Sequence, residues 1–147
     1  MVKDLLESTT PVYTLGTTST LSEIPIHSIR QYINNGLIIP FKKESNRHLF
    51  SHVDILRLKY IHKLLVEDGL NIAGIKSVFA LIPCWAIRKC SAEEREKCQA
   101  FHSDTFPCWD ASEKGQLCKN SNCRECEVYK IVENSPNVKS YLKTLVL

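Results

Sequence analysis

All seven cysteines of this 147-residue chain lie between Cys84 and Cys126. Cysteine sulfur binds soft metal ions as a thiolate, forms disulfides, or packs as a small apolar group. Cys123 and Cys126 have two residues between them, a spacing typical of zinc sites and of one edge of an iron–sulfur cluster. Cys118 precedes Cys123 with four residues between, so three thiolates can converge from one loop. A fourth ligand would come from one of Cys84, Cys90, Cys98 and Cys108.

The cysteine segment permits three interpretations. It has few large apolar side chains, so a bound metal would supply folding energy that its core lacks, and this favours metal binding. Reversible disulfide formation is the second interpretation, and with seven cysteines it leaves at least one thiol unpaired. The third is that the free cysteines pack as small apolar residues. His102 is a further candidate ligand under the first interpretation.

Both tryptophans of the chain directly follow a cysteine, in a Pro-Cys-Trp tripeptide that occurs at residues 83–85 and again at 107–109. We expect Trp85 and Trp109 to pack around the sulfurs and exclude water, which would tune the potential of a bound cluster. The first copy also ends the apolar pattern of the preceding residues, because proline interrupts a helix.

The overall composition is that of a globular protein, with 44% hydrophobic and 24% charged residues. No apolar run approaches the roughly 18 residues that a membrane span needs, and the first residues do not resemble a signal peptide. We therefore expect a cytoplasmic protein with no membrane partner, in which cysteines are thiols or metal ligands and disulfides are disfavoured.

Positive charge is concentrated between Pro25 and Lys63. This stretch holds two acidic residues, four of the five histidines, and seven basic residues: Arg30, Lys42, Lys43, Arg47, Arg57, Lys59 and Lys63. Such a concentration predicts that this part of the chain meets an anionic partner.

The basic stretch contains a predicted helix that begins near Pro25. Ile26, Ile29 and Ile33 repeat on one face, and Asn35-Gly36 provides a stop signal. The opposite face carries polar side chains, namely His27, Ser28, Arg30 and Gln31. The preceding residues 16–24 are rich in threonine and serine and have poor helix propensity.

Further elements follow the predicted helix. The runs "LIIPF" and "HLF" flank "KKESN" and predict a hairpin with a basic, polar tip. Ser51 with Asp54 predicts the start of a third helix, with an apolar face of Ile55, Leu58, Ile61 and Leu65. Asn71 caps a fourth helix that Pro83 ends. Helices followed by a basic hairpin and another helix are typical of a winged helix-turn-helix protein that binds DNA.

Residues 12–82 resemble the DNA-binding domain of the MerR family of bacterial transcription regulators. Tyr13 to Gly16 match the start of the family pattern, and the later matches are Arg30, Tyr32, Gly36, Leu37, Ile38, Pro40, Phe50, Ser51, Asp54, Gly69, Ile72 and Ile75. The resemblance implies double-stranded promoter DNA as partner and an indirect relation to RNA polymerase. The residues that it implies as DNA contacts are His27, Ser28, Arg30 and Gln31 on the second helix, and Lys42, Lys43, Arg47 and His48 on the wing.

The chain departs from the family pattern in several places. Glu23 stands where a turn glycine is usual, His27 where arginine is common, and Gln31 where an aromatic residue is common. The long helix by which family members usually dimerise is replaced at Pro83 by the cysteine segment. A homodimer remains an expectation, and residues 137–147 predict a further helix that either serves association or closes the second domain.

Residues 84–130 resemble a small cysteine-rich module named for its two Cys-Trp pairs, which occurs in signalling and regulatory proteins. The resemblance implies a sensor-like domain without assigning ligands. Since seven thiols exceed the need of one zinc ion and a regulator gains from a redox-active cofactor, we favour an iron–sulfur cluster over zinc.

The predicted architecture is mainly α: a winged helix-turn-helix of four helices and a small β-hairpin wing (residues 1–82), then a small, cysteine-rich, irregular or helical domain (residues 83–147). The predicted function is DNA-binding transcription regulation controlled by metal, redox state or oxygen. One alternative is a thiol redox protein that uses Cys123 and Cys126, and another is an interaction adaptor whose winged domain does not bind DNA. The sequence has no phosphate-binding loop, nucleophile elbow or paired-carboxylate site, so we do not expect an enzyme.

Overall fold

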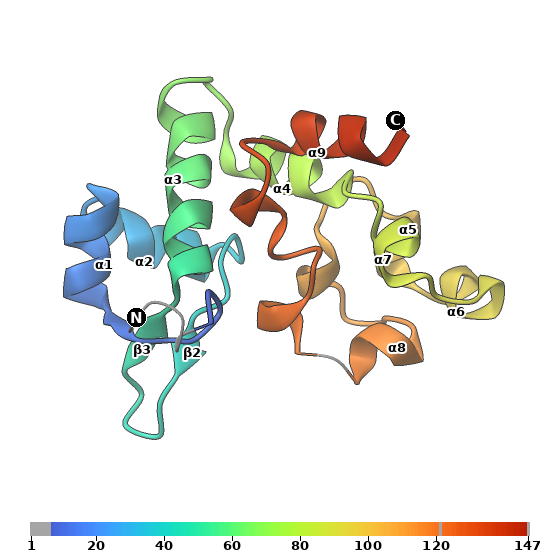
Figure 1. Cartoon of the computed structure of the whole chain (residues 1–147), viewed down its shortest axis with the longest axis horizontal. Helices are drawn as coiled ribbons and strands as arrows, with labels where there is room; N and C mark the ends of the chain where they lie inside the picture. The colour runs from blue at the N-terminus through green and yellow to red at the C-terminus, as the bar shows by residue number, and fades with distance from the viewer. Residues whose placement is uncertain (1–6, 121, 147) are drawn as a thin grey trace. The chain divides into compact units, whose positions relative to one another are not determined.

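The computed structural model describes residues 7–120 and 122–146 (Figure 1). It is mainly helical with one small antiparallel sheet, which confirms the predicted fold class. The chain divides into two compact units, a first unit that ends at Glu67 and a second unit that begins at Asp68. The helix predicted after Asn71 therefore belongs to the second unit. Every helix in the described part of the chain is too short or too polar to cross a bilayer.

From residue 7 onward, the first unit combines three helices with a three-stranded sheet. Its elements are β1 (Tyr13–Thr14), α1 (Leu15–Ser22), α2 (Ile26–Asn34), β2 (Phe41–Lys42), β3 (His48–Phe50) and α3 (His52–Val66). β3 is the central strand and pairs antiparallel with both β1 and β2. The β2–β3 hairpin confirms the predicted wing, and β1 adds a third strand to it.

Helix α1 forms although its composition disfavours a helix. The Thr14 hydroxyl accepts a hydrogen bond from the backbone N–H of Thr17 and so caps the first turn. Packing against α2 and α3 buries Thr18 and Ser22, so tertiary contacts outweigh weak propensity here. The helix ends at Glu23, whose φ of 61° lies in the left-handed region.

Helix α2 follows the predicted limits but not the whole of the predicted buried face. Pro25 occupies the N-cap position without a side-chain hydrogen bond, and Gly36, with a φ of 73°, follows the end of the helix. Ile29 is fully buried, whereas Ile26, from the same apolar repeat, is 39% exposed. Tyr32 is buried instead, and its hydroxyl lies 2.8 Å from His62 Nδ1 on α3. This contact joins α2 to α3.

Helix α3 begins with the predicted capping box. The Ser51 hydroxyl accepts from the Asp54 N–H, and the Asp54 carboxylate accepts from the Ser51 N–H. Arg57, one of the seven basic residues of the stretch predicted to meet an anionic partner, is completely buried and donates through Nη2 to the Leu37 carbonyl at 3.1 Å. A buried guanidinium that satisfies a loop carbonyl holds the fold together and is not available to an anionic partner.

The second unit consists of short helices and 3₁₀ turns. Its elements are α4 (Ile72–Ala80), α5 (Cys84–Arg88), α6 (Ala92–Glu96), α7 (Gln99–His102), η2 (Cys108–Asp110), α8 (Gln116–Lys119), η3 (Cys123–Glu125), η4 (Ile131–Glu133) and α9 (Val138–Val146). The Asn71 side chain caps α4 as predicted, accepting from the Gly74 N–H at 2.7 Å. Helix α9 confirms the predicted C-terminal helix, and its first residue Val138 is buried.

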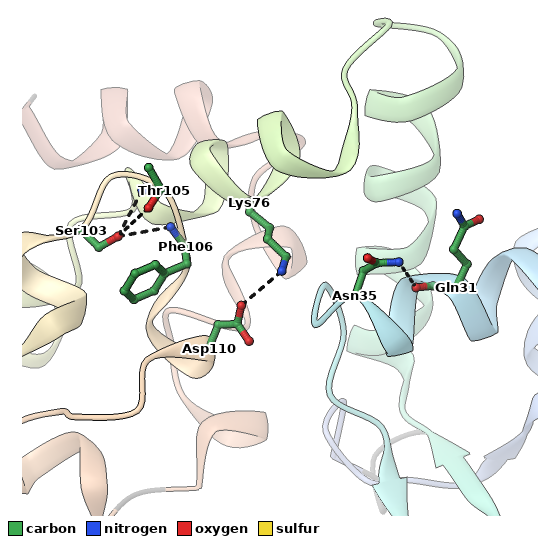
Figure 2. A network of polar contacts seen from close by, with 7 residues as sticks. All are labelled: Gln31, Asn35, Lys76, Ser103, Thr105, Phe106 and Asp110. Atoms are coloured by element: carbon green, nitrogen blue, oxygen red, sulfur yellow. Dashed lines mark hydrogen bonds and ion pairs between the residues drawn. The ribbon is translucent and has the colours of Figure 1, made fainter.

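Two contacts attach α4 to η2, which contains the second Cys-Trp pair. Lys76 Nζ lies 3.4 Å from Asp110 Oδ2 (Figure 2). The rings of Phe79 and Trp109 lie 5.6 Å apart between centroids. Figure 2 also shows the loop before η2, where the Ser103 hydroxyl accepts hydrogen bonds from two later backbone N–H groups. Helix α4 is therefore fixed to the cysteine segment by an ion pair and an aromatic contact.

Candidate functional site

The structure brings all seven cysteines to two adjoining cavities of the second unit. The first cavity is lined by Cys84, Cys108, Cys118, Cys123 and Cys126, and the second by Cys84, Cys90, Cys98, Cys108 and Cys118. Three cysteines and Arg88 line both cavities, so the two spaces share a wall. The predicted set of sulfur ligands is thus gathered from α5 to η3, although its members are spread over more than forty positions of the sequence.

Positive charge lies beside these sulfurs. Lys114 lines the first cavity, and its Nζ lies 3.6 Å from Cys123 Sγ. Arg88 lines both cavities, and its charge lowers the pKa of the Cys118 thiol against the larger, raising effect of burial. Cations placed in this way favour thiolates over thiols and offset the negative charge of a metal–thiolate centre.

Aromatic rings form part of the cavity walls. Trp109 and Tyr129 line the first cavity and meet edge to face, with ring centroids 5.6 Å apart. Trp85 packs edge to face at 5.3 Å on Phe101, which lines the second cavity. Both tryptophans therefore contact side chains around the sulfurs, although only Trp109 itself is among the lining residues named for the two cavities.

Burial keeps several of these sulfurs protonated in the metal-free protein. Burial, with added repulsion from neighbouring cysteines, raises the pKa of Cys108 to about 12 and that of Cys84 to about 11. A metal ion that binds them must displace protons, because the thiolate is the ligand.

The donor set suits a soft or borderline metal, since several thiols face one space with cations nearby. In the described residues, no three or more His, Cys, Asp or Glu side chains converge closely enough to hold a metal ion as they stand. The sulfurs would have to move inward on binding. His102 is exposed, lies 3.0 Å through Nε2 from the Glu96 carbonyl, and is not among the residues that line the two cysteine cavities.

The predicted DNA contacts of α2 are mostly accessible. His27, Arg30 and Gln31 are exposed, while Ser28 is half-buried. The Asn35 side chain donates to the Gln31 carbonyl at 2.8 Å and closes the end of the helix (Figure 2). The polar face of α2 can therefore meet a ligand without rearrangement of the helix.

The wing presents its cations on a tight turn. Lys43 N–H donates to the Arg47 carbonyl and Asn46 N–H donates to the Lys43 carbonyl, each at 2.9 Å. Asn46 has a φ of 64°, a conformation that asparagine tolerates better than most residues. Lys42, Lys43 and Arg47 are exposed and His48 is half-buried.

A groove in the first unit collects half of these candidates. It has a volume of about 680 Å³ and is lined by Thr14, Leu15, Gly16, Arg30, Lys43, Asn46, Arg47, His48 and Leu49. Of the eight predicted DNA contacts, Arg30, Lys43, Arg47 and His48 line it, while His27, Ser28, Gln31 and Lys42 lie outside its lining. Cations and backbone N–H groups at one groove are the chemistry that positions a nucleic-acid phosphate.

The residues that line this groove lie within a stretch of the chain that matches a known protein family. Residues 13–81 match the model for MerR HTH family regulatory proteins. Residues 13–81 form a MerR HTH domain. Over 71 residues the chain is 37% identical to the HTH-type transcriptional regulator GlnR of Bacillus anthracis and of Bacillus cereus, covering 48% of this chain and 54% of theirs. Over 76 residues it is 33% identical to the heat shock protein HspR of Streptomyces coelicolor, covering 52% and 50%.

The chain spans about half the length of the curated relatives that it matches. The MerR domain ends at residue 81, before Cys84, so the cysteine segment lies outside the matched stretch. Helix α4 is the last element inside the match, yet it packs in the second unit.

Part of the lining of the groove in the MerR domain was not among the predicted DNA contacts. Thr14 and Gly16 from the start of α1, and Asn46 from the wing turn, line it without having been predicted as contacts. A side chain added at Gly16 would meet open space, so the backbone there is accessible to a ligand. The signal available in the sequence was the threonine cap followed by glycine at a helix start.

Proposed function

We propose that this protein is a DNA-binding transcription regulator whose cysteine-rich second unit senses metal, redox state or oxygen. The observation that carries the proposal is the gathering of all seven cysteines around two cavities in a chain that also contains a MerR HTH domain. The first feature supports a sensing role, and the second supports the regulatory output.

DNA binding is supported by the groove of the first unit. Arg30 on α2 and Arg47 on the wing line the same open space, so a duplex can be held by phosphate contacts while α2 meets base edges. GlnR, which the chain matches over 71 residues, is an HTH-type transcriptional regulator. We extend DNA binding to this chain on that basis.

Metal binding is supported by the donor set of the second unit. An iron–sulfur cluster would supply reversible electron transfer, and zinc would supply a structural cross-link. The part of the protein is to orient the sulfurs from α5, η2, α8 and η3, to place Lys114 and Arg88 beside them, and to exclude water with Trp109 and Tyr129. Both metals suit these residues.

We propose that helix α4 transmits a change at the cysteine cavities of the second unit to the MerR domain. It belongs to the MerR domain by sequence and to the second unit by packing. Through Phe79 it contacts Trp109, which lines the first cavity, and through Lys76 it contacts Asp110. A change in the cavity would shift α4 between two arrangements and so alter DNA affinity.

The proposal is tested on full-length protein purified without oxygen. Metal analysis and the absorption spectrum report the bound species, and a mobility shift at low salt on the gene's own upstream region reports DNA binding. We expect bound metal and a DNA affinity that changes when the metal is removed or oxidised. A folded, colourless and metal-free protein would contradict sensing through metal, and intact metal without any DNA shift would instead favour an interaction adaptor.

The proposed route through α4 has its own test. Phe79→Leu keeps an apolar side chain but removes the ring contact with Trp109. We expect unchanged metal content and a loss of the metal-dependent change in DNA affinity, with Leu81→Ala as control because Leu81 is 57% exposed near the same helix end. An unaltered response in Phe79→Leu would show that coupling does not pass through this contact.

We also propose that the regulator acts as a homodimer near RNA polymerase, because family members read paired half-sites. Sedimentation of the protein with and without a duplex that carries both half-sites tests this. A monomer bound to a single half-site would contradict it.

A further inference from the structure

Two cysteines of the first cavity are joined by a single backbone turn. Cys126 N–H donates to the Cys123 carbonyl at 3.1 Å, at the end of η3. A hydrogen bond between residues i and i+3 of a turn goes with a Cα separation below about 7 Å, and disulfides span Cα separations of about 4.4–6.8 Å. The turn therefore holds these two residues at a separation that suits a disulfide, without the approach of any other element.

Both cysteines also reach the same cavity. Cys123 and Cys126 line the first cavity, and neither is among the residues that line the second. Lys114 lines the first cavity too, and its Nζ lies 3.6 Å from Cys123 Sγ, so this contact directs the Cys123 sulfur towards the cavity. The other three cysteines of this cavity come from α5, η2 and α8. A disulfide to one of them would close a longer loop between separate elements, whereas the turn already holds this pair together.

The room around the pair limits the oxidant that can reach it. Cys123 and Cys126 are half-buried, and the first cavity has room for about one water-sized sphere, approximately 20 Å³. A small hydroperoxide such as hydrogen peroxide needs little more space than water, whereas a peptide disulfide is many times larger. A small hydroperoxide is therefore the class of oxidant that fits this site.

We propose that Cys123 and Cys126 form a reversible disulfide when a small hydroperoxide reaches the metal-free protein. One thiolate of the pair attacks a peroxide oxygen, the O–O bond breaks, and the sulfur becomes a sulfenic acid. The second thiolate attacks the sulfenic sulfur, so that the S–S bond forms and the S–O bond breaks. The two thiols lose two electrons and two protons, and hydrogen peroxide is reduced to two water molecules. A dithiol reductant reverses the reaction and is itself oxidised to a disulfide.

This inference rests on the proposed sensing of redox state and deepens it, since the backbone after Cys126 leads to the ring contacts of the second unit. The Cys126 carbonyl accepts hydrogen bonds from the N–H groups of Tyr129 and Lys130, each at 3.0 Å. The Tyr129 ring meets the Trp109 ring edge to face, and Trp109 contacts Phe79 of α4, each with ring centroids 5.6 Å apart. A change of the Cys126 conformation on disulfide formation therefore acts on the contact through which α4 is proposed to respond.

The test is mass spectrometry of full-length protein that has been reduced, stripped of metal and then exposed to a stoichiometric amount of hydrogen peroxide. The remaining thiols are blocked, and the denatured protein is digested with trypsin. Trypsin cleaves after Arg124, between the two cysteines, so a disulfide of this pair holds the peptides 120–124 and 125–130 together. We expect these linked peptides after peroxide, and their separation on treatment with a dithiol.

Serine variants separate this pair from the other cysteines. Cys123→Ser and Cys126→Ser should each abolish the linked peptides, whereas Cys90→Ser, which changes a residue of the second cavity, should retain them. The peptide map of the wild-type protein decides the matter if a variant does not fold. A predominant link between any other two cysteines, or no disulfide at all, would overturn the inference.

Failure of this inference differs from failure of the proposed function. Bound metal and a metal-dependent DNA shift, with no disulfide between Cys123 and Cys126 after peroxide, would overturn the disulfide alone. A disulfide of this pair in a protein that binds no DNA, reduced or oxidised, would support the inference and contradict the proposed regulator.

Discussion

The first unit and the cysteine segment of the second unit differ in the length of their helices. The first unit encloses Ile29, Tyr32, Phe50 and Leu58, each at most 1% exposed, beneath helices of eight to fifteen residues. The cysteine segment of the second unit has helices of four or five residues, and one of its core clusters consists of Cys98, Ala100 and Ala111. Burial of a large apolar side chain contributes about 1.5–3 kcal/mol, whereas a structural zinc ion contributes about 10–16 kcal/mol. A bound metal ion would therefore add stability beyond that of the side chains that the segment buries, among them Val128, Tyr129 and Ile131.

The units also use positive charge differently. Arg30 and Arg47 line an open groove and are exposed, so their effect on an anionic ligand weakens as salt rises. Arg88 and Lys114 stand beside half-buried sulfurs. We expect the first unit to respond to ionic strength and the second to metal, thiol oxidation and pH.

Metal removal should produce the largest difference between the two units, measured as their protection from hydrogen exchange. Treatment with a chelator under reducing conditions should lower the hydrogen-exchange protection of residues 84–131 more than that of residues 13–66, because the helices of the cysteine segment have only four or five residues. Hydrogen exchange followed by mass spectrometry resolves the two stretches. Equal protection of both before and after chelation would show that the cysteine segment folds without metal.

Arg30→Ala should reduce DNA affinity by about 1–3 kcal/mol, roughly tenfold to a hundredfold, because this α2 side chain lines the groove. Lys59→Ala is the matched control, since Lys59 is an exposed cation of α3 that does not line the groove. Fluorescence anisotropy across a salt series measures both. Equal losses in the two variants would mean that only net charge matters.

Alkaline pH should destabilise the metal-free second unit. The folded state raises the pKa of Cys108 to about 12 and that of Cys84 to about 11, from an ordinary value of 9.0. The unfolded chain therefore loses these protons first, so the stabilisation is complete below pH 9 and is lost as pH rises from about 9 towards 12. Tryptophan fluorescence during urea unfolding measures this, and Cys108→Ala should flatten the dependence. An unchanged slope in that variant would contradict the assignment.

Gly16→Ala should have the smallest effect, and it should act in opposite directions on stability and binding. Alanine should stabilise the first unit by about 0.4–1 kcal/mol, because it restricts the unfolded chain and its added methyl group meets open space. The same methyl group should reduce DNA affinity severalfold if a phosphate approaches the start of α1. Thermal unfolding measures stability and fluorescence anisotropy measures DNA affinity. Higher stability with unchanged DNA affinity would show that Gly16 is not part of the DNA interface.

Local signals in the sequence predicted the limits of α2 and the starts of α3 and α4. The Ser51–Asp54 capping box, the Asn71 cap and the stop at Gly36 depend on groups within a few residues of one another, and all three are confirmed. The MerR resemblance is confirmed by the match at residues 13–81. The DNA contacts, the metal ligands and the dimer remain predictions.

Three-dimensional packing decided what residue type could not. Arg57 looks like a surface cation but is buried against the Leu37 carbonyl, and Ile26 looks like a core residue but is 39% exposed. The Cys-x₂-Cys spacing identified one pair of neighbours, whereas the wall shared by Cys84, Cys108 and Cys118 required α5, η2 and α8 to meet. The sequence alone determined the kinds of chemistry available, because side-chain type and short spacing are local. Only the tertiary structure decided which sulfurs face one another, because that depends on contacts between residues far apart in the chain.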